Sequence, residues 1–342
     1  MRGLFPMKRK VGVFFDEFDP ADTVHLESAV SEAVSSGFSS VLMVLRRGKA
    51  EETYENRWRI LVASCSGSRI LVPVRTEQNT VNGNMEFLNR NFPEDELVII
   101  DKKNRRSSGF CIKEIEESEI HPDSWYVCSP SVCLPLPSYE YIMAAGLYGI
   151  PSRVPESRRW FDILFPALKP HRFAHSLSVA ATARILAERF GENPEKAEKA
   201  GLLHDCAKNL PLEEMRKIVR DAAMDLDENM MRQDSLLHSA AGACLVQSLY
   251  GVTDPEIIDA VASHNTGRPG MSRLSMCVCL ADSIEPGRMP YPKLDEIRSL
   301  SEISLEKALL VSLIGVRDQV LSNGWYLHPR TRDTIDWLSA ME

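Results

Sequence analysis

The sequence predicts two domains, an α/β domain with a parallel sheet followed by a bundle made only of helices. The chain has 342 residues, which is more than a single hydrophobic core usually organises. Short apolar runs typical of strands alternate with helical patterns up to about residue 150, and strand signals then vanish. Proline residues at 151 and 155, followed by a polar stretch, indicate a linker. We therefore expect domains at 1–150 and 151–342.

The first half contains continuous apolar runs that we interpret as buried strands, at 11–15, 41–45, 70–74 and 97–100. Helical patterns at 24–34 and 54–63 separate the first three runs. Continuous apolar strands separated by helices indicate a parallel sheet that is covered on both faces. The first half is therefore predicted to be a Rossmann-like sheet of the open, nucleotide-binding type.

The second half shows only helical patterns. An amphipathic segment at 176–190 stops at Gly191, a residue that commonly follows the end of a helix. Pro194 and Pro211 can each open a further helix. Additional helices are predicted at about 235–250, 254–264, 272–285, 304–322 and 330–341.

Composition places the chain among ordinary globular proteins, with 44% hydrophobic and 26% charged residues. It has no apolar run of about 18 residues, so we expect no membrane partner, and its start does not resemble a secretion signal. The net charge of -8 argues against nucleic acid as a general partner. Eight cysteines without a Cys-x-x-Cys pair indicate reduced thiols in a cytoplasmic protein.

Histidine and aspartate residues gather in the helical half, at His171, His175, His204, Asp205, His238, His264 and Asp282. Imidazole and carboxylate groups suit a borderline divalent metal, and residues 171 and 175 share one face of a helix. His204-Asp205 and Asp282 stand in otherwise apolar segments, where unpaired polar groups are costly to bury. One such histidine alone is usually a hydrogen-bonded core residue, but several together favour a metal site suited to hydrolysis at phosphorus.

Three motifs resemble those of the HD-superfamily phosphohydrolases: His175-Ser176-Leu177, Leu203-His204-Asp205-x-x-Lys208 and Leu280-Ala281-Asp282. One branch is more similar still, the bacterial symmetrical diadenosine tetraphosphatases. That resemblance rests on Leu236-Leu237-His238, on His264-Asn265-Thr266-Gly267-Arg268 and on Ala281-Asp282-Ser283-Ile284-Glu285-Pro286-x-Arg288. It extends from about residue 170 to residue 328.

The resemblance implies an α-helical HD-domain bundle that hydrolyses diadenosine tetraphosphate, or a related dinucleoside polyphosphate, to two ADP by a metal-activated water. The implied cofactor is one or two divalent ions, iron first, with manganese or cobalt as alternatives. One ion would be held by His175, His204, Asp205 and Asp282, and a second by His238 and His264, with Asp205 bridging. A homodimer through exposed apolar helix faces is a further expectation.

The same resemblance assigns residues to the substrate. Asp205, Lys208 and Arg268 are the implied catalytic group, and the last two would also neutralise phosphate oxygens. Arg288 is a further candidate for substrate binding. His171 and Arg172 would contact the nucleotide, although a surface helix start explains them equally well.

Residues 9–150 resemble the nicotinate-nucleotide adenylyltransferases, through Phe18-Asp19-Pro20, His25-Leu26 and the segment 139–149. The fold implied is a Rossmann-like nucleotidyltransferase domain. Phe15 and Asp16 replace two glycines of that family, whose backbone N–H groups approach phosphate, and Asp22 replaces its first histidine. We therefore expect adenylyl transfer to be lost.

Two further segments of the first half bear on that prediction. The family's later phosphate-binding element survives only in altered form at 107–113, and a basic run precedes it at 102–106. The run suits either a phosphate-binding loop or a solvated surface loop. Alternatives to the hydrolase are therefore retained adenylyltransferase activity in the first domain and a nucleotide-sensing module without rapid turnover.

Overall fold

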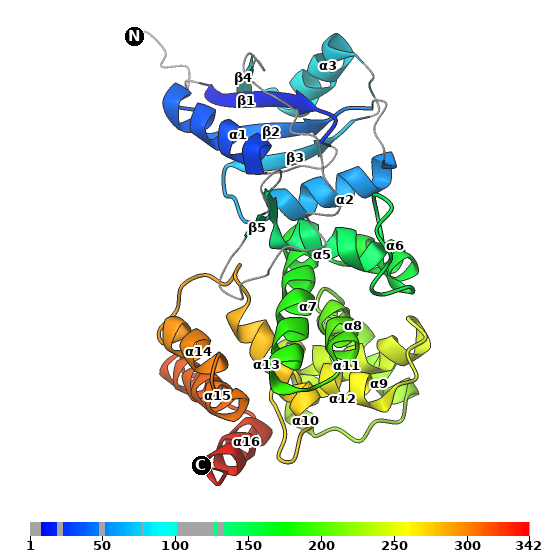
Figure 1. Cartoon of the computed structure of the whole chain (residues 1–342), viewed down its shortest axis with the longest axis vertical. Coiled ribbons are helices and arrows are strands. Elements are labelled where there is room, and N and C mark those ends of the chain that lie inside the picture. Colours follow the sequence, from blue (N-terminus) through cyan, green and yellow to red (C-terminus); the bar gives the residue numbers. More distant parts are fainter. Residues whose placement is uncertain are drawn as a thin grey trace. The chain divides into compact units, whose positions relative to one another are not determined.

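The computed structural model describes residues 8–18, 23–47, 52–76, 78, 80–100, 126–128 and 133–341 (Figure 1). The chain divides between Ser152 and Arg153 into two compact units. The segments 19–22, 102–106 and 107–113, which carry most of the altered adenylyltransferase motifs, lie outside the described residues. Each unit is described by itself.

The first unit is built on a four-stranded parallel sheet in the order β3-β2-β1-β4. The strands are β1 (Arg9–Asp16), β2 (Ser40–Leu45), β3 (Leu71–Arg75) and β4 (Asp95–Ile99). Val13 of β1 pairs with Leu42 of β2 and with Ile99 of β4, and both Val13 and Leu42 are buried. Parallel, apolar strands were predicted for this half, and the α/β prediction is confirmed.

Helices α1 (Thr23–Ser36), α2 (Tyr54–Cys65) and α3 (Val81–Asn91) connect the strands (Figure 1). A short antiparallel pair, β5 (Tyr126–Cys128) and β6 (Cys133–Pro135), leads into the fully buried helix α5 (Leu136–Ala145). The sequence did not predict this pair. Cys133 is disulfide-bonded, contrary to the expectation of reduced cysteines, whereas five described thiols are free, those of Cys65, Cys206, Cys244, Cys277 and Cys279.

The second unit is helical throughout its described residues, as predicted (Figure 1). Its helices are α6 (Ser157–Ala167), α7 (Pro170–Phe190), α8 (Pro194–Leu203), α9 (Leu212–Asp221), α10 (Glu228–Arg232), α11 (Asp234–Ser248), α12 (Pro255–Ser263), α13 (Arg273–Ile284), α14 (Leu294–Ser301), α15 (Leu305–Ser322) and α16 (Pro329–Ser339).

Helix boundaries differ from the sequence predictions in two places. Helix α7 begins at Pro170 rather than at residue 176, because proline is well suited to the first turn, and it thereby includes His171 and His175. Helix α6 begins at Ser157, inside the stretch predicted to be a linker. No helix among the described residues is long and apolar enough to cross a membrane.

Close packing of α7 on α8 sets the position of the candidate site. A Cβ atom on Gly201 of α8 would lie 2.7 Å from the Cα atom of Ala180 on α7, so the two backbones meet where only glycine fits. This approach brings the rings of His175 and His204 to a centroid separation of 5.2 Å.

Candidate metal centre

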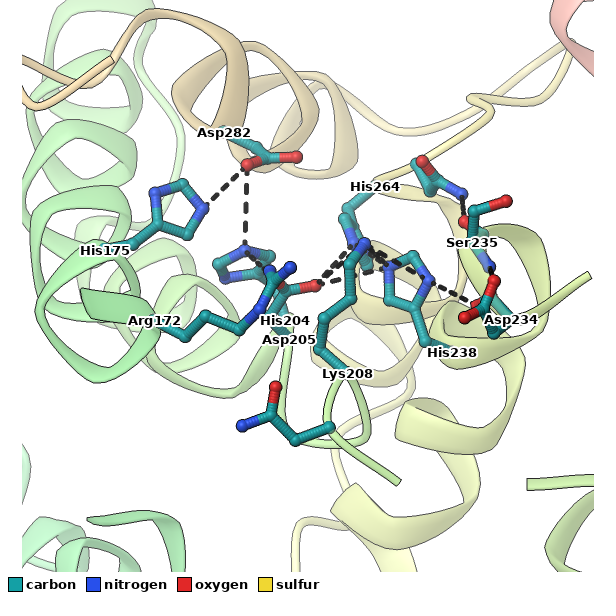
Figure 2. A network of polar contacts seen from close by, with 12 residues as sticks. Arg172, His175, His204, Asp205, Lys208, Asp234, Ser235, His238, His264 and Asp282 are labelled. Carbon is teal, nitrogen blue, oxygen red and sulfur yellow. Dashed lines mark hydrogen bonds and ion pairs between the residues drawn. The ribbon is translucent and has the colours of Figure 1, made fainter. Parts of the chain in front are cut away.

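The structure brings all of the predicted metal ligands together, although they come from five helical segments (Figure 2). His175 lies on α7, His238 on α11 and Asp282 near the end of α13. His204 and His264 are the residues that end α8 and α12, and Asp205 follows directly. Helices that converge in one core therefore place imidazole and carboxylate groups around a common centre.

The two histidines at helix ends are oriented by the same local hydrogen bond. The Nδ1 atom of His204 donates to the carbonyl of Gly201 at 2.7 Å, and that of His264 donates to the carbonyl of Val261 at 2.8 Å. A ring that donates through Nδ1 keeps a lone pair on Nε2. The Nε2 atom of His204 is buried and has no hydrogen-bond partner, which is costly unless a ligand satisfies it.

Asp205 lies between two sets of histidines. Its Oδ1 atom is 3.2 Å from Nε2 of His238 and 3.7 Å from Nε2 of His264. Its Oδ2 atom is 3.8 Å from Nε2 of His204. One carboxylate therefore faces both halves of the cluster, the geometry that a bridging ligand requires.

Asp282 completes the other side of the cluster. Its Oδ1 atom is 3.0 Å from Nε2 of His175 and 3.8 Å from Nε2 of His204 (Figure 2). The Oε1 atom of Glu285 lies 3.1 Å from Nδ1 of His175 and so holds the far side of that ring. Sequence reasoning gave Glu285 no role. Its position one turn beyond Asp282, just past the end of α13, was the available signal.

His238 and His264 face each other through nitrogen atoms that cannot both donate. The Nδ1 atom of His238 lies 3.2 Å from the carbonyl of Asp234, so both rings present Nε2 as an acceptor, and these two atoms are 3.2 Å apart. The ammonium group of Lys208 lies 2.9 Å from Nε2 of His238. Two facing acceptors beside a carboxylate favour a cation between them.

The residues present therefore fit a divalent metal ion. Three overlapping groups have ligand atoms within 4.8 Å of one another, namely His175 with His204 and Asp205, His204 with His264 and Asp282, and Asp205 with His238 and His264. Neutral imidazole and ionised carboxylate are the forms that bind such an ion.

Electrostatic effects keep most of the histidines of the cluster neutral and its aspartates ionised. Burial lowers the pKa of His204 to about 3 and that of His238 to about 4, against the attraction of nearby carboxylates. Burial opposes ionisation of Asp205 and Asp282, but His204 and Arg288 respectively are the main groups that hold these two pKa values well below the usual range. For His175, burial is outweighed by hydrogen bonds to Asp282 and Glu285, which raise its pKa to about 9.

Three of the predicted cations stand around the cluster. An Nη1 atom of Arg172 is 3.2 Å from Oδ2 of Asp205, and Nζ of Lys208 is 3.6 Å from its Oδ1. Arg288 forms an ion pair with Asp282 and donates to its backbone carbonyl. All three side chains are partly exposed, so they can also meet the oxygens of an incoming phosphate.

Arg268 and His171 are placed differently. The guanidinium of Arg268 donates two hydrogen bonds of 2.9 Å to Asp259, a bidentate pairing that also involves the hydroxyl of Ser275. His171 is exposed in the first turn of α7, where partial burial and Arg172 lower its pKa. Among the described residues, neither side chain forms a hydrogen bond or ion pair with a member of the cluster. Their predicted roles in substrate binding therefore stay predictions.

The first unit has its own histidine and carboxylate at the end of β1. The Nε2 atom of His25 lies 3.3 Å from Oδ2 of Asp16. The His25 ring also packs edge-on against Phe14 and Phe18, with centroids 6.4 and 5.7 Å away. Phe15, one of the two residues that replace the family glycines, is buried.

Comparison with known proteins identifies the family of the helical half. Residues 172–287 match the family described as the HD domain. Symmetrical bis(5'-nucleosyl)-tetraphosphatases of Bacillus subtilis and Halalkalibacterium halodurans are 41% identical over 174 residues and 35% identical over 177 residues. These matches cover 50% and 52% of this chain, and 91% and 94% of the relatives.

Two further proteins are similar to parts of this chain. A probable nicotinate-nucleotide adenylyltransferase/Ap4A hydrolase of Mycoplasma genitalium is 31% identical over 192 residues, which are 55% of this chain and 51% of that protein. A crystal structure described as a predicted HD superfamily hydrolase involved in NAD metabolism, from Clostridium acetobutylicum, is 37% identical with a TM-score of 0.53. It covers 54% of this chain and 98% of its own.

The helical fold and its buried cluster of imidazoles and carboxylates thus define an HD-domain hydrolase. Within that superfamily, the chain belongs to the family that includes the symmetrical bis(5'-nucleosyl)-tetraphosphatases.

Proposed function

We propose that the second unit hydrolyses diadenosine tetraphosphate, or a closely related dinucleoside polyphosphate, to two ADP with the help of a divalent metal. The observation that carries this proposal is the buried, unpartnered Nε2 atom of His204, which faces Asp205 and Asp282 in a chain related to enzymes of that name. Iron is the proposed metal, with manganese or cobalt as alternatives.

The metal ligands follow from the two sides of the cluster. His175, His204, Asp205 and Asp282 would hold one ion, and His238 and His264 would hold a second, with Asp205 shared. A divalent ion supplies Lewis-acid chemistry here, because it lowers the pKa of water and polarises phosphate oxygens.

The cationic side chains of the protein itself would bind and position the substrate. Arg172, Lys208 and Arg288 would hold the phosphate oxygens and keep the central P–O–P bond over the cluster. Hydrolysis adds the oxygen of one water to one central phosphorus and leaves the bridging oxygen on the other. A cut at that bond gives two ADP, whereas a cut at either outer bond gives ATP and AMP.

The products of the reaction test this proposal. Chelator-treated full-length protein would be reloaded without oxygen with iron(II), manganese or cobalt, and the nucleotides separated by ion exchange. We expect two ADP for each diadenosine tetraphosphate and no turnover before reloading. ATP with AMP would contradict the symmetrical cut. Intact nucleotide retained on the metal-loaded protein would instead support the sensing module.

A further inference from the structure

A cavity of about 490 Å³ opens in the second unit beside the His238 and His264 side of the cluster. Asn265 and Thr266, which directly follow His264, form one wall, and Ser235 in the first turn of α11 adjoins them. Figure 2 shows Ser235 on the His238 side of the network, away from His175. The opposite wall comes from the end of α15 and the segment that leads into α16.

The opposite wall presents two aromatic side chains that the fold leaves accessible. Trp325 is 63% exposed and Tyr326 is 41% exposed, although both line the cavity. Large aromatic rings normally lose much of their surface on folding, and exposed ones beside a cavity mark a place where a ligand binds. A planar aromatic ligand suits such a wall best, because rings stack face to face with an offset.

Polar contacts hold the part of this wall that lies next to α16 in place. His328 is buried, donates from Nε2 to Asp227 at 2.8 Å, and accepts from the backbone N–H of Arg330 at the start of α16. The ring of Tyr326 lies against it with a centroid separation of 6.3 Å. The aromatic wall is therefore anchored to α16.

Apolar side chains and a few polar groups line the rest of the cavity. Gln233 and Asn265 offer amide donors and acceptors, and Thr331 offers a hydroxyl. The Nδ2 atom of Asn265 donates to the carbonyl of Ser235 at 2.6 Å, which fixes this amide in the wall of the cavity. A volume of this size lies within the range of small-ligand sites. Flat apolar faces with a few amides at the edge match a nucleobase, which has both π faces and a polar rim.

We propose that this cavity binds the base of one nucleoside of the substrate, with Trp325 and Tyr326 as the stacking residues. This inference rests on the proposed function, because it places that nucleoside next to a phosphate held at the metal cluster. The cluster cannot distinguish a nucleotide from a bare phosphate chain. Specificity for a base therefore comes from the cavity.

Equilibrium binding tests this inference without turnover. Metal-loaded, full-length protein would be titrated calorimetrically with ADP and, separately, with inorganic pyrophosphate, which has phosphates but no base. We expect Trp325→Ala to raise the dissociation constant for ADP about tenfold or more, since loss of one base–aromatic stack typically has an effect of that size. Binding of pyrophosphate should not change. Trp325→Phe should retain most of the ADP affinity.

A matched control comes from the same part of the chain. Leu321 on α15 is also exposed but does not line the cavity, so Leu321→Ala should bind both ligands as the unmodified chain does. Three outcomes overturn the inference: no ADP binding by the unmodified chain, unchanged ADP binding in both Trp325→Ala and Tyr326→Ala, or equal weakening of ADP and pyrophosphate. An unmodified chain that binds ADP through Trp325, yet releases ATP and AMP from diadenosine tetraphosphate, contradicts the proposed reaction and supports the cavity.

Discussion

Both units place a histidine beside a carboxylate, but the two pairs are set in different surroundings. His25 of α1 lies beside the carboxylate of Asp16, the last residue of β1, and its side chain is 22% exposed. His204 has no exposed surface, and its Nε2 atom faces Asp205 and Asp282 at 3.8 Å without a hydrogen-bond partner. A buried acceptor without a partner lowers stability unless a ligand satisfies it. The contrast teaches that burial and a missing hydrogen-bond partner, rather than the residue types alone, separate His204 from His25.

The largest effect is expected from removing the shared carboxylate of the second unit. Asp205→Asn should abolish both bound metal and hydrolysis, because its carboxylate lies between the two sets of histidines. Asp16→Asn makes the same chemical change beside His25 and should leave hydrolysis intact. Metal content by elemental analysis and turnover of diadenosine tetraphosphate would be measured on both variants.

Either of two results would contradict the expected difference between these variants. Full hydrolysis by Asp205→Asn would remove the assigned role of the cluster. Loss of hydrolysis in Asp16→Asn, with metal retained, would show that the first unit takes part in the reaction.

A smaller effect is expected when pH changes the affinity of the cluster for its metal. In the metal-free protein the pKa of His175 is raised to about 9, so below that pH a metal must displace its proton. Affinity should therefore rise about tenfold for each pH unit and level off above pH 9. His204 and His238, with pKa values of about 3 and 4, are already neutral and add no slope between pH 6 and 9. Manganese titrations at several pH values check this.

Glu285→Gln is the control for that slope. It removes a carboxylate that helps to raise the pKa of His175, so affinity should level off at a lower pH. The plateau affinity should also fall about 10- to 100-fold, because the ring loses the group that orients it. An unchanged profile would contradict the role of Glu285 in raising the pKa of His175 and in orienting its ring.

The smallest effect concerns packing. Gly201→Ala would place a Cβ atom 2.7 Å from backbone atoms of α7, which cannot move alone, so we expect a loss of about 1–3 kcal/mol in the free energy of unfolding. Gly12→Ala in β1 would meet the ends of the Ile100 and Phe38 side chains at 2.8 Å, which can move aside, so its loss should be smaller. Urea unfolding measures both. Equal losses would contradict the close approach of α7 and α8.

Much of this arrangement could be predicted from the sequence. Apolar runs gave the parallel strands, and the prolines and glycines that flank helices gave most helix ends of the second unit. The candidate metal ligands were indicated by His204-Asp205 and Asp282 in segments that must be buried, and the full ligand set followed from the resemblance to the HD-superfamily phosphohydrolases. Their convergence follows once several helices share one core.

Contacts between elements could not be predicted in the same way. Glu285 acts on His175 across 110 positions of sequence, and only the packing of α13 beside α7 brings them together. Arg268 was expected to meet phosphate, but Asp259 on the preceding helix offers it a bidentate partner at 2.9 Å. A pairing of that kind depends on the turn around Gly267, which has a φ of 64°, as well as on the two residue types.

The two histidines that end α8 and α12 carry one more consequence. Both histidines directly follow the last turn of their helix, so the negative end of each helix dipole lies beside the cluster. Part of the attraction for a cation thus belongs to the backbone, and it is lost when the final turns fray. Binding of an ion should then slow amide hydrogen exchange at the ends of these two helices more than elsewhere in the bundle.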